Sequence, residues 1–228
     1  MSLRVDVVNV FVDESGAHGN PLGIVRSTAA TRGHEQQIAS ELGFSETVFV
    51  EDVVEGTATA RIFTPAQELP FAGHPTVGLA AWLHRSGSAI EGIQVPAGRV
   101  RVRIGDDLVL VTARPEWAPQ FALDRLASAS EVEAADPDGY GRGPAYVWAW
   151  RDEPAGSVRA RMFAPDLGIR EDEATGAAAM RLTAALQRDL EILQGAGSVI
   201  RTRVRASGRE VELGGRVAAA GTVELPRT

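Results

Sequence analysis

Hydrophobic and polar positions along this chain predict a protein built mainly from β-strands. Short runs rich in Val and Ile, separated by Gly, Asn, Asp and Pro, are typical of strands joined by turns. Such runs cover residues 4–11, 22–26, 47–53, 57–63, 90–95, 99–104, 108–112, 145–150, 157–163, 191–193, 199–206, 210–213 and 216–225. The expected sheet is mostly antiparallel.

Four segments predict helices, at residues 31–42, 74–86, 121–135 and 173–188. The first begins at Thr31, a residue type that caps helix starts, and ends before Gly43. The second is apolar on almost every side, which is typical of a buried helix. Pro75 suits its first turn, because proline has no N–H group to leave unpaired.

The start of the helix at residues 74–86 is a candidate anion pocket. A buried helix has free N–H groups at its start, and these groups need partners. Here they lie beside Gly73 and His74, which places a titratable side chain next to backbone donors.

The pattern Arg-x-Phe-x-Pro occurs twice, at residues 61–65 and 161–165. Each copy leads through a short loop to an apolar helix with a threonine near its start, Thr76 or Thr175. A strand, a loop and a buried helix repeated in the same order indicate an internal duplication. We therefore expect an α+β fold of two pseudo-symmetric half-domains, residues 1–114 and 115–228. Each half would pack a sheet around a central helix, and both helix starts would face one catalytic cleft.

The composition of the chain excludes several classes of partner and of catalytic group. The net charge of −7 argues against nucleic acid as a partner, and no apolar run approaches the length of a membrane span. The first residues enter a strand pattern without a signal peptide, so the expected location is the cytoplasm. The 228 residues include no cysteine and no lysine, which excludes thiolate nucleophiles, Cys-zinc sites and Schiff-base chemistry. Proton transfer therefore rests on carboxylates, histidines or tyrosines.

Glu46 is one candidate for proton transfer. It stands where a helix gives way to a strand, among Phe44, Val48 and Phe49. Apolar surroundings raise the pKa of a carboxyl, which suits it to take a proton from carbon and return it. A glutamate at the start of a strand is also an ordinary surface residue, and the periodicity by itself favours that second interpretation.

His74 and Asp172 are two further candidates. His74 could act as a general acid or a hydrogen-bond donor, although histidines near helix starts are often only structural. Asp172 lies in the acidic run 171–173, and acidic residues before a helix stabilise its dipole. The dipole alone does not explain why this run falls near the position that Gly73 and His74 hold in the first copy.

Two other interpretations use the same residues. Ser45, His74 and Asp172 include the residue types of a hydrolase triad, but the G-x-S-x-G turn of such enzymes is missing. Glu46, His74 and Asp172 could be considered as metal ligands, but a second histidine is lacking. We expect no metal site.

Several motifs together resemble the PhzF-like phenazine-biosynthesis proteins. They are Gly-Asn-Pro at 19–21, Ser-Glu-Thr at 45–47, Phe-Thr-Pro at 63–65, the block at 68–76, Glu-Asp-Glu-Ala-Thr-Gly at 171–176 and Gln-Gly at 194–195. The resemblance extends from residue 4 to about residue 225. It implies the diaminopimelate-epimerase fold, in which two pseudo-symmetric halves each wrap a curved sheet around a central helix. It also implies a homodimer that needs no metal or organic cofactor.

The resemblance also implies roles for single residues. Glu46 would be the acid/base that moves a proton between carbons of the substrate, and His74 and Asp172 would flank it. The expected substrate-binding residues are Asn20, Ser45, Gly73, Thr175, Gly176 and Ala177. The substrate would be a small carboxylate, received by N–H groups at both helix starts. In the phenazine enzyme itself the reaction is the isomerisation of trans-2,3-dihydro-3-hydroxyanthranilate.

The chain departs from the family pattern near the expected site. Ala177 stands where the family often has Ser, and Glu173 where it usually has Pro. The loop at residues 195–198 is shorter than its family counterpart, and the segment around 115–157 is trimmed. Two alternatives to an isomerase therefore stay open. One is a binding or sequestering protein that kept the pocket and lost the reaction, and the other is a structural or partner-binding module.

Overall fold

The computed structural model describes residues 2–226, and its strands form one 15-stranded sheet. The first eight strands are β1 Ser2–Val12, β2 Asn20–Arg26, β3 Thr47–Val54, β4 Thr57–Phe63, β5 Glu68–Leu69, β6 Gly92–Val95, β7 Gly98–Ile104 and β8 Val109–Ala113. The others are β9 Ala122–Arg125, β10 Ala145–Asp152, β11 Ser157–Ala164, β12 Ile169–Asp172, β13 Leu190–Gln194, β14 Ser198–Arg205 and β15 Glu210–Pro226. The α-helices of the described residues are α1 Glu35–Leu42, α2 Gly73–Arg85, α3 Ala129–Ala134 and α4 Gly176–Leu186.

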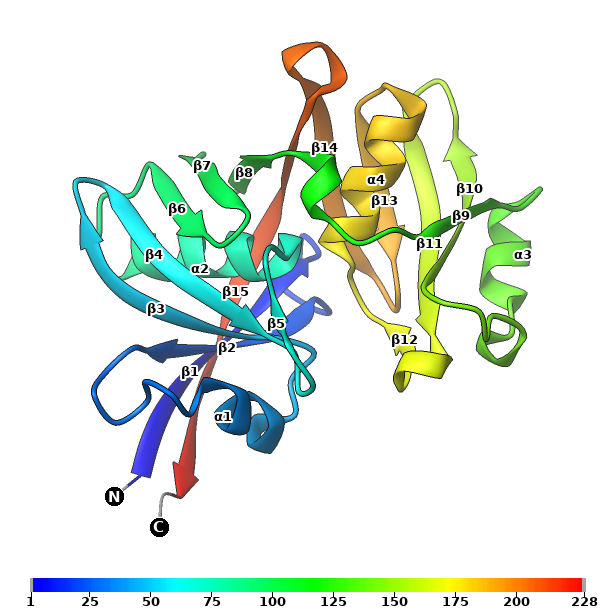
Figure 1. Cartoon of the computed structure of the whole chain (residues 1–228). Helices are drawn as coiled ribbons and strands as arrows, with labels where there is room; N and C mark the ends of the chain where they lie inside the picture. The colour runs from blue at the N-terminus through cyan, green and yellow to red at the C-terminus, as the bar shows by residue number, and fades with distance from the viewer. Residues whose placement is uncertain (1, 227–228) are drawn as a thin grey trace.

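One connection pattern occurs twice in the sheet. In the first copy β4 leads through α2 to its parallel neighbour β6, and in the second β11 leads through α4 to its parallel neighbour β13. An antiparallel strand precedes each unit (β3 or β10), and antiparallel strands follow it (β7 and β8, or β14 and β15). Figure 1 shows the two units side by side, with α2 in one and α4 in the other. A symmetry relation between the halves stays a prediction.

The last strand connects the two regions. β15 pairs antiparallel with β14 on one side and with β8 on the other through residues 210–215. Its continuation, residues 216–226, pairs antiparallel with β1. The long strand therefore runs from one region into the other (Figure 1). The division at residues 114 and 115 stays a prediction. At the far end of this pairing, Pro226 lies opposite Ser2.

The repeated Arg-x-Phe-x-Pro pattern has the same physical role in both places. Arg61 donates two hydrogen bonds to Glu68 on β5, and its guanidinium lies 4.9 Å from the centre of the Phe63 ring. Arg161 donates two hydrogen bonds to Glu171 on β12, and lies 4.7 Å from the Phe163 ring. Each arginine therefore ties the short strand before a central helix to the long strand behind it.

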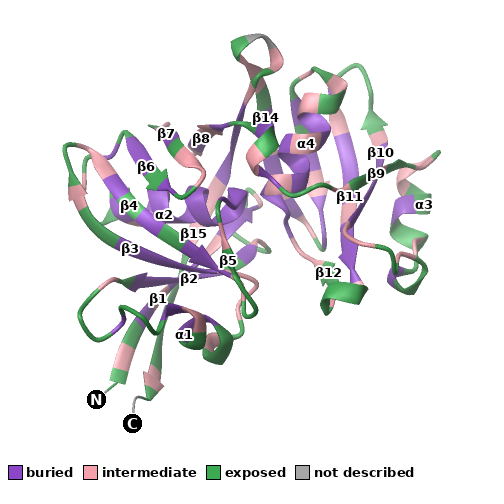
Figure 2. Ribbon diagram, viewed as in Figure 1, coloured by how far each residue is buried: buried purple, intermediate pink, exposed green. Residues whose placement is uncertain are grey.

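The main core is formed around the two central helices. In α2 every residue except Trp82, His84 and Arg85 is buried, which confirms the buried helix predicted for residues 74–86. α4 buries the face that carries Ala178, Ala179, Met180 and Leu182. Figure 2 shows both helices largely in the colour of buried residues. Burial of apolar area at about 25 cal/mol per Å² is the main stabilising contribution of such a core.

Some expected elements differ from the structure. The helix expected at 121–135 is wrong in its first half, because residues 122–125 pair parallel with β10 as β9. Only α3 is helical there, and its start is capped by the Ser128 hydroxyl, which accepts the Glu131 N–H. The periodic pattern did not reveal a strand whose polar residues lie at the edge of the sheet.

Two further boundaries need correction. Thr31 does not cap a helix, because its hydroxyl accepts the Thr28 N–H and closes a turn, and α1 begins only at Glu35. The end of α1 at Gly43 is confirmed, with a φ of 68° that glycine adopts without strain. The strands expected at 210–213 and 216–225 are one strand, β15. No helix within residues 2–226 is long and apolar enough to cross a bilayer.

Candidate active site

Glu46 and His74 come together from separate elements. Glu46 directly precedes β3, and His74 is the second residue of α2. The Glu46 Oε2 atom lies 3.4 Å from the His74 Nδ1 atom. Only 3% of the His74 side chain and 19% of the Glu46 side chain are exposed. The two side chains therefore meet in a nearly dry environment, in which a small part of Glu46 is still exposed.

Asp172, at the end of β12, is held by donors from both regions of the chain. Its Oδ1 atom accepts a hydrogen bond from the Asn20 side-chain amide at 2.8 Å, and its Oδ2 atom accepts one from the Thr175 hydroxyl at 2.5 Å. The same Asn20 amide also donates to the Ala174 carbonyl at 3.0 Å. These bonds place Asp172 close enough to Glu46 and His74 for their charges to act on its carboxyl.

Asn20 also links Asp172 to the residue beside Glu46. The Ser45 hydroxyl donates to the Asn20 Oδ1 atom at 3.2 Å. A hydrolase triad needs a serine hydroxyl that donates to the histidine. Because Ser45 donates to Asn20, this geometry does not favour the hydrolase interpretation.

The starts of α2 and α4 face each other at this place. A Cβ atom added to Gly73 would lie 2.9 Å from the Gly176 carbonyl carbon and 3.0 Å from the Ala177 nitrogen. A Cβ atom added to Gly176 would lie 3.0 Å from the His74 nitrogen. Only glycine permits such a close approach of two backbones. Within residues 2–226 no side chain caps either helix start, so N–H groups and two positive dipole ends converge here.

Burial decides the protonation of the cluster. Removal from water raises the pKa of Glu46 to about 7, against the lowering effect of the Ser45 hydroxyl. Burial lowers the pKa of His74 to about 4, although the Asp172 charge and the Pro21 carbonyl oppose this change. Burial and then the Glu46 charge raise the pKa of Asp172. Near pH 7, His74 is therefore neutral and Glu46 lies close to half ionisation, the condition in which a carboxyl both accepts and returns a proton.

Gln194 and Tyr146 form hydrogen bonds next to the cluster and hold its members in place. The residue patterns of the sequence did not identify either of them as a site residue. The fully buried Gln194 amide donates to the Thr175 hydroxyl at 2.9 Å and to the Asp172 carbonyl at 3.0 Å. Its oxygen accepts the Thr175 N–H and the Tyr146 hydroxyl. Gln194 was part of a family motif, which was its only signal, whereas Tyr146 gave no signal apart from its place in an apolar strand.

Comparison with known protein families now identifies the chain. The family model of PhzC-PhzF, described as phenazine biosynthesis-like protein, matches residues 8–114 and 118–224. The chain belongs to this family. The family resemblance expected from the motifs is thereby confirmed.

Relatives and solved structures agree with this assignment. The trans-2,3-dihydro-3-hydroxyanthranilate isomerase of Pseudomonas aeruginosa is 30% identical, over 90% of this chain and 91% of the relative. A PhzF-family crystal structure from Enterococcus faecalis matches all of both chains with a TM-score of 0.79 at 21% identity. A hydroxyproline epimerase from Agrobacterium vitis matches 98% of this chain and 92% of its own with a TM-score of 0.66 at 16% identity. The fold is thus shared by PhzF proteins and by epimerases.

The expected site residues of this PhzC-PhzF-family chain are therefore close together. Asn20, Ser45, Gly73, Thr175, Gly176 and Ala177 all lie at or beside the contacts of Glu46, His74 and Asp172. The Thr175 hydroxyl and N–H have partners in Asp172 and Gln194, and its part in binding substrate stays a prediction. Its roles in this structure are to hold Asp172 and Gln194. Within residues 2–226 no three acidic or histidine side chains are arranged to hold a metal ion.

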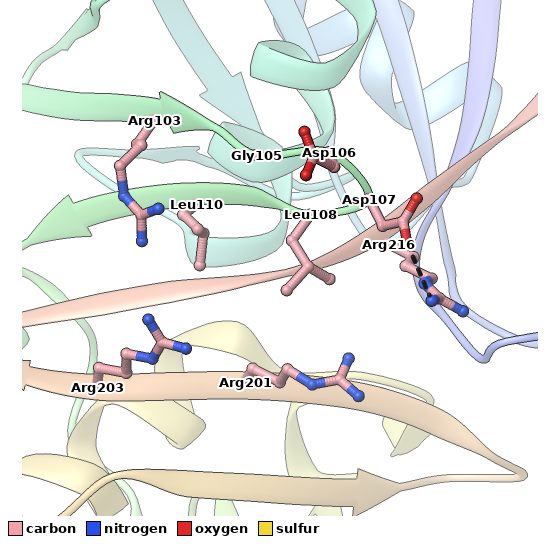
Figure 3. A pocket seen from close by; sticks show the side chains of 9 residues that line it. All are labelled: Arg103, Gly105, Asp106, Asp107, Leu108, Leu110, Arg201, Arg203 and Arg216. Carbon is pink, nitrogen blue, oxygen red and sulfur yellow. Dashed lines mark hydrogen bonds and ion pairs between the residues drawn. The ribbon is translucent and has the colours of Figure 1, made fainter.

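A different surface of the protein gathers arginines. A hollow of about 360 Å³ between the β7–β8 turn and β14 is lined by Arg103, Arg201, Arg203 and Arg216 among others (Figure 3). Arg103 pairs with Glu212 at 2.9 Å, Arg201 with Glu191 at 2.9 Å, and Arg216 with Asp107 at 3.5 Å. This arginine face, as we call these four arginines and their acidic partners, is a network of ion pairs between partly exposed arginines and carboxylates, of which Glu212 is buried. It is separate from the Glu46 cluster.

Proposed function

We propose that this protein is an isomerase that moves a proton between two carbons of a small carboxylate substrate, with Glu46 as the proton carrier. The observation that carries the proposal is the buried pair of Glu46 and His74. Among the described residues no group is in hydrogen-bonding geometry with the buried His74 Nε2 atom, although the Pro21 carbonyl lies near enough to the ring to affect its pKa, and Nδ1 faces Glu46. A buried polar atom without a partner is costly, so its presence beside a carboxyl with a pKa of about 7 supports a binding site for substrate.

The converging helix starts support a carboxylate as the anchoring group of the substrate. N–H groups at the starts of α2 and α4 lie next to His74, and neither helix has a side chain that occupies its first donors. Backbone donors and the positive ends of two helix dipoles stabilise an anion. A substrate carboxylate held there would bring a neighbouring C–H bond within reach of Glu46.

The proposed reaction needs only one proton and no net change in oxidation state. The ionised Glu46 takes a proton from one carbon, and the electron pair of that bond moves into the adjacent unsaturated system. Glu46 then returns the proton to a second carbon of the same system. Neutral His74 positions the substrate through Nε2, and Asp172 is held in place by Asn20 and Thr175. The proposed reaction uses no cofactor.

The substrate class is suggested by the named relative. The Pseudomonas aeruginosa protein is named as an isomerase of trans-2,3-dihydro-3-hydroxyanthranilate, a cyclic amino- and hydroxy-substituted carboxylate. We take a compound of this type as the first candidate for this chain. The proposed enzyme acts as a homodimer in the cytoplasm.

Hydrogen exchange in deuterated water tests the proposal. The protein is incubated with trans-2,3-dihydro-3-hydroxyanthranilate in D2O, and ¹H NMR follows product formation and the loss of carbon-bound hydrogen. We expect Glu46→Gln to reduce exchange by about 10²–10⁴-fold and to keep ligand affinity, because only the proton carrier is lost. The matched control is Glu51→Gln, which changes an exposed glutamate of the same strand β3. Exchange by Glu46→Gln at the wild-type rate would refute the role of Glu46.

A binding protein without catalysis is the second candidate, because one surrounding loop is already closed by protein groups. Donors of the loop at residues 195–198 are taken by the Glu173 carboxylate, and Ala177 brings no hydroxyl to the start of α4. The same experiment separates the two functions. Saturable binding by the wild-type protein with no exchange of carbon-bound hydrogen identifies a binder.

A further inference from the structure

Glu173 connects three loops beside the candidate site. Its carboxylate accepts the Ala196 N–H at 2.9 Å and the Ser198 hydroxyl at 2.8 Å. The Ser198 oxygen in turn accepts the Gly19 N–H at 2.9 Å. We call these four residues the Glu173 clasp. It joins the loop before β2, the segment before α4 and the turn between β13 and β14.

The turn between β13 and β14 is shaped to receive these contacts. A Cβ atom added to Gly195 would lie 2.5 Å from the Glu173 carboxyl carbon. A Cβ atom added to Gly197 would lie 2.6 Å from the His18 ring, which comes from the same loop as Gly19. Two glycines therefore make room for the Glu173 and His18 side chains, so the short turn and Glu173 fit as one unit.

The clasp is linked to both carboxylates of the candidate site. Gly19 is followed by Asn20, whose amide donates to Asp172 and whose oxygen accepts the Ser45 hydroxyl. Ser45 is the residue before Glu46, and Asp172 is the residue before Glu173. A shift of Gly19 would therefore change the position of Asp172 relative to Glu46. Loops with few buried contacts move readily unless hydrogen bonds restrain them.

We propose that Glu173 is a positioning residue that, through Ser198 and Gly19, fixes Asn20 and thereby the separation of Glu46 from Asp172. The proposal rests on the proposed function only in so far as these two carboxylates act on substrate. Glu173 itself does not touch the reacting atoms. The Glu46 charge is one cause of the raised pKa of Asp172, after burial, so the pKa of Asp172 reports on the separation of the two carboxyls.

The first test needs no substrate. Hydrogen exchange of the Gly19 amide is measured by NMR for the wild-type protein and for Glu173→Ala, Ser198→Ala and the double variant. We expect about tenfold faster exchange in each single variant, the equivalent of one lost hydrogen bond of about 1.4 kcal/mol, and little further change in the double variant. Glu14→Ala, an exposed glutamate of the same loop outside the clasp, is the control and should leave Gly19 unchanged. If the Gly19 amide of Glu173→Ala exchanges at the wild-type rate, Glu173 does not restrain Gly19 and the proposal is wrong.

The second test asks whether the clasp positions the site or only stabilises the fold. ¹³C NMR titration of the Asp172 carboxyl should show a midpoint that falls in Glu173→Ala and is partly restored in Glu173→Asp, because the Glu46 charge raises the pKa of Asp172 less at a longer distance. With turnover, kcat should fall by about tenfold and KM by less, since positioning acts on the transition state. An Asp172 midpoint equal to that of the wild type in a folded Glu173→Ala variant overturns the positioning role. Because the titration does not depend on turnover, absent catalysis would contradict the proposed function and leave this result standing.

Discussion

The protein contains two clusters of titratable or charged side chains, and the carboxyls in them have different partners and different contact with water. In the Glu46 cluster, two carboxyls and a histidine lie together, and none of them is hydrogen-bonded to an arginine of the described chain. Burial shifts the pKa values of Glu46 and His74 toward their neutral forms. In the arginine face, Glu212 is also buried, but it accepts hydrogen bonds from Arg103 and from the neighbouring Arg205 of β14. The sides of those arginines that face water keep them solvated, with 54% and 39% of their side chains exposed.

This difference indicates which of the two clusters is suited to proton transfer. Glu212 serves as an acceptor for arginines whose other sides are in contact with water. An uncompensated carboxyl in a dry place shifts its pKa toward neutral pH, at a cost to stability. Removing the charge should therefore have opposite effects on stability in the two clusters.

The largest effect on stability is expected at Glu46. Its pKa is 4.5 in its ordinary state and about 7 in the folded protein, so between these values the folded state binds more protons than the unfolded state. The free energy of unfolding consequently falls as the pH rises through this window and is level above it. Glu46→Gln removes the penalty, so urea unfolding should show a gain of about 3 kcal/mol at pH 8 and none at pH 4. A variant that is less stable than the wild type at pH 8 contradicts this account.

A second effect concerns the rate at different pH values. Because the reaction begins with ionised Glu46, kcat/KM should rise with pH and level off above about 7. At pH 5, about two pH units below the pKa of Glu46, kcat/KM should be about 100-fold lower, because protonation of one group reduces the ionised fraction tenfold per pH unit. Titration of His74 should cause no further change in kcat/KM above pH 5, since burial keeps its pKa at about 4. A rate that stays constant from pH 5 to pH 8 would show that Glu46 does not need to be ionised.

The smallest effect is expected in the arginine face. Glu212→Gln leaves Arg103 and Arg205 without their charged acceptor, but both arginines can turn to water. We expect a loss of about 1 kcal/mol in the free energy of unfolding, smaller at 1 M salt, with hydrogen exchange of substrate unchanged. Urea unfolding at two salt concentrations provides the measurement. A gain in stability, as predicted for Glu46→Gln, would remove the distinction between the two clusters.

Much of the fold was predictable because local chemistry specifies it. Gly43 ended α1 as predicted, and the apolar run after Pro75 became the buried helix α2. The short strands β5 and β12 were missed, since each is defined by backbone pairing with a neighbouring strand and is too short to show a pattern of its own. β9 was missed because its partner β10 lies twenty or more residues away in the chain.

The amino-acid sequence by itself determined the chemical inventory and the local elements. It specified the absence of cysteine and lysine, the repeated Arg-x-Phe-x-Pro pattern and the candidates Glu46, His74 and Asp172. Only the tertiary structure decided that Glu46 and His74 lie 3.4 Å apart, that Asn20 ties Asp172 to Ser45, and that Glu173 closes a turn. The physical reason is that a pKa and a hydrogen bond depend on which groups meet in space and how much water remains, and neither follows from spacing along a chain.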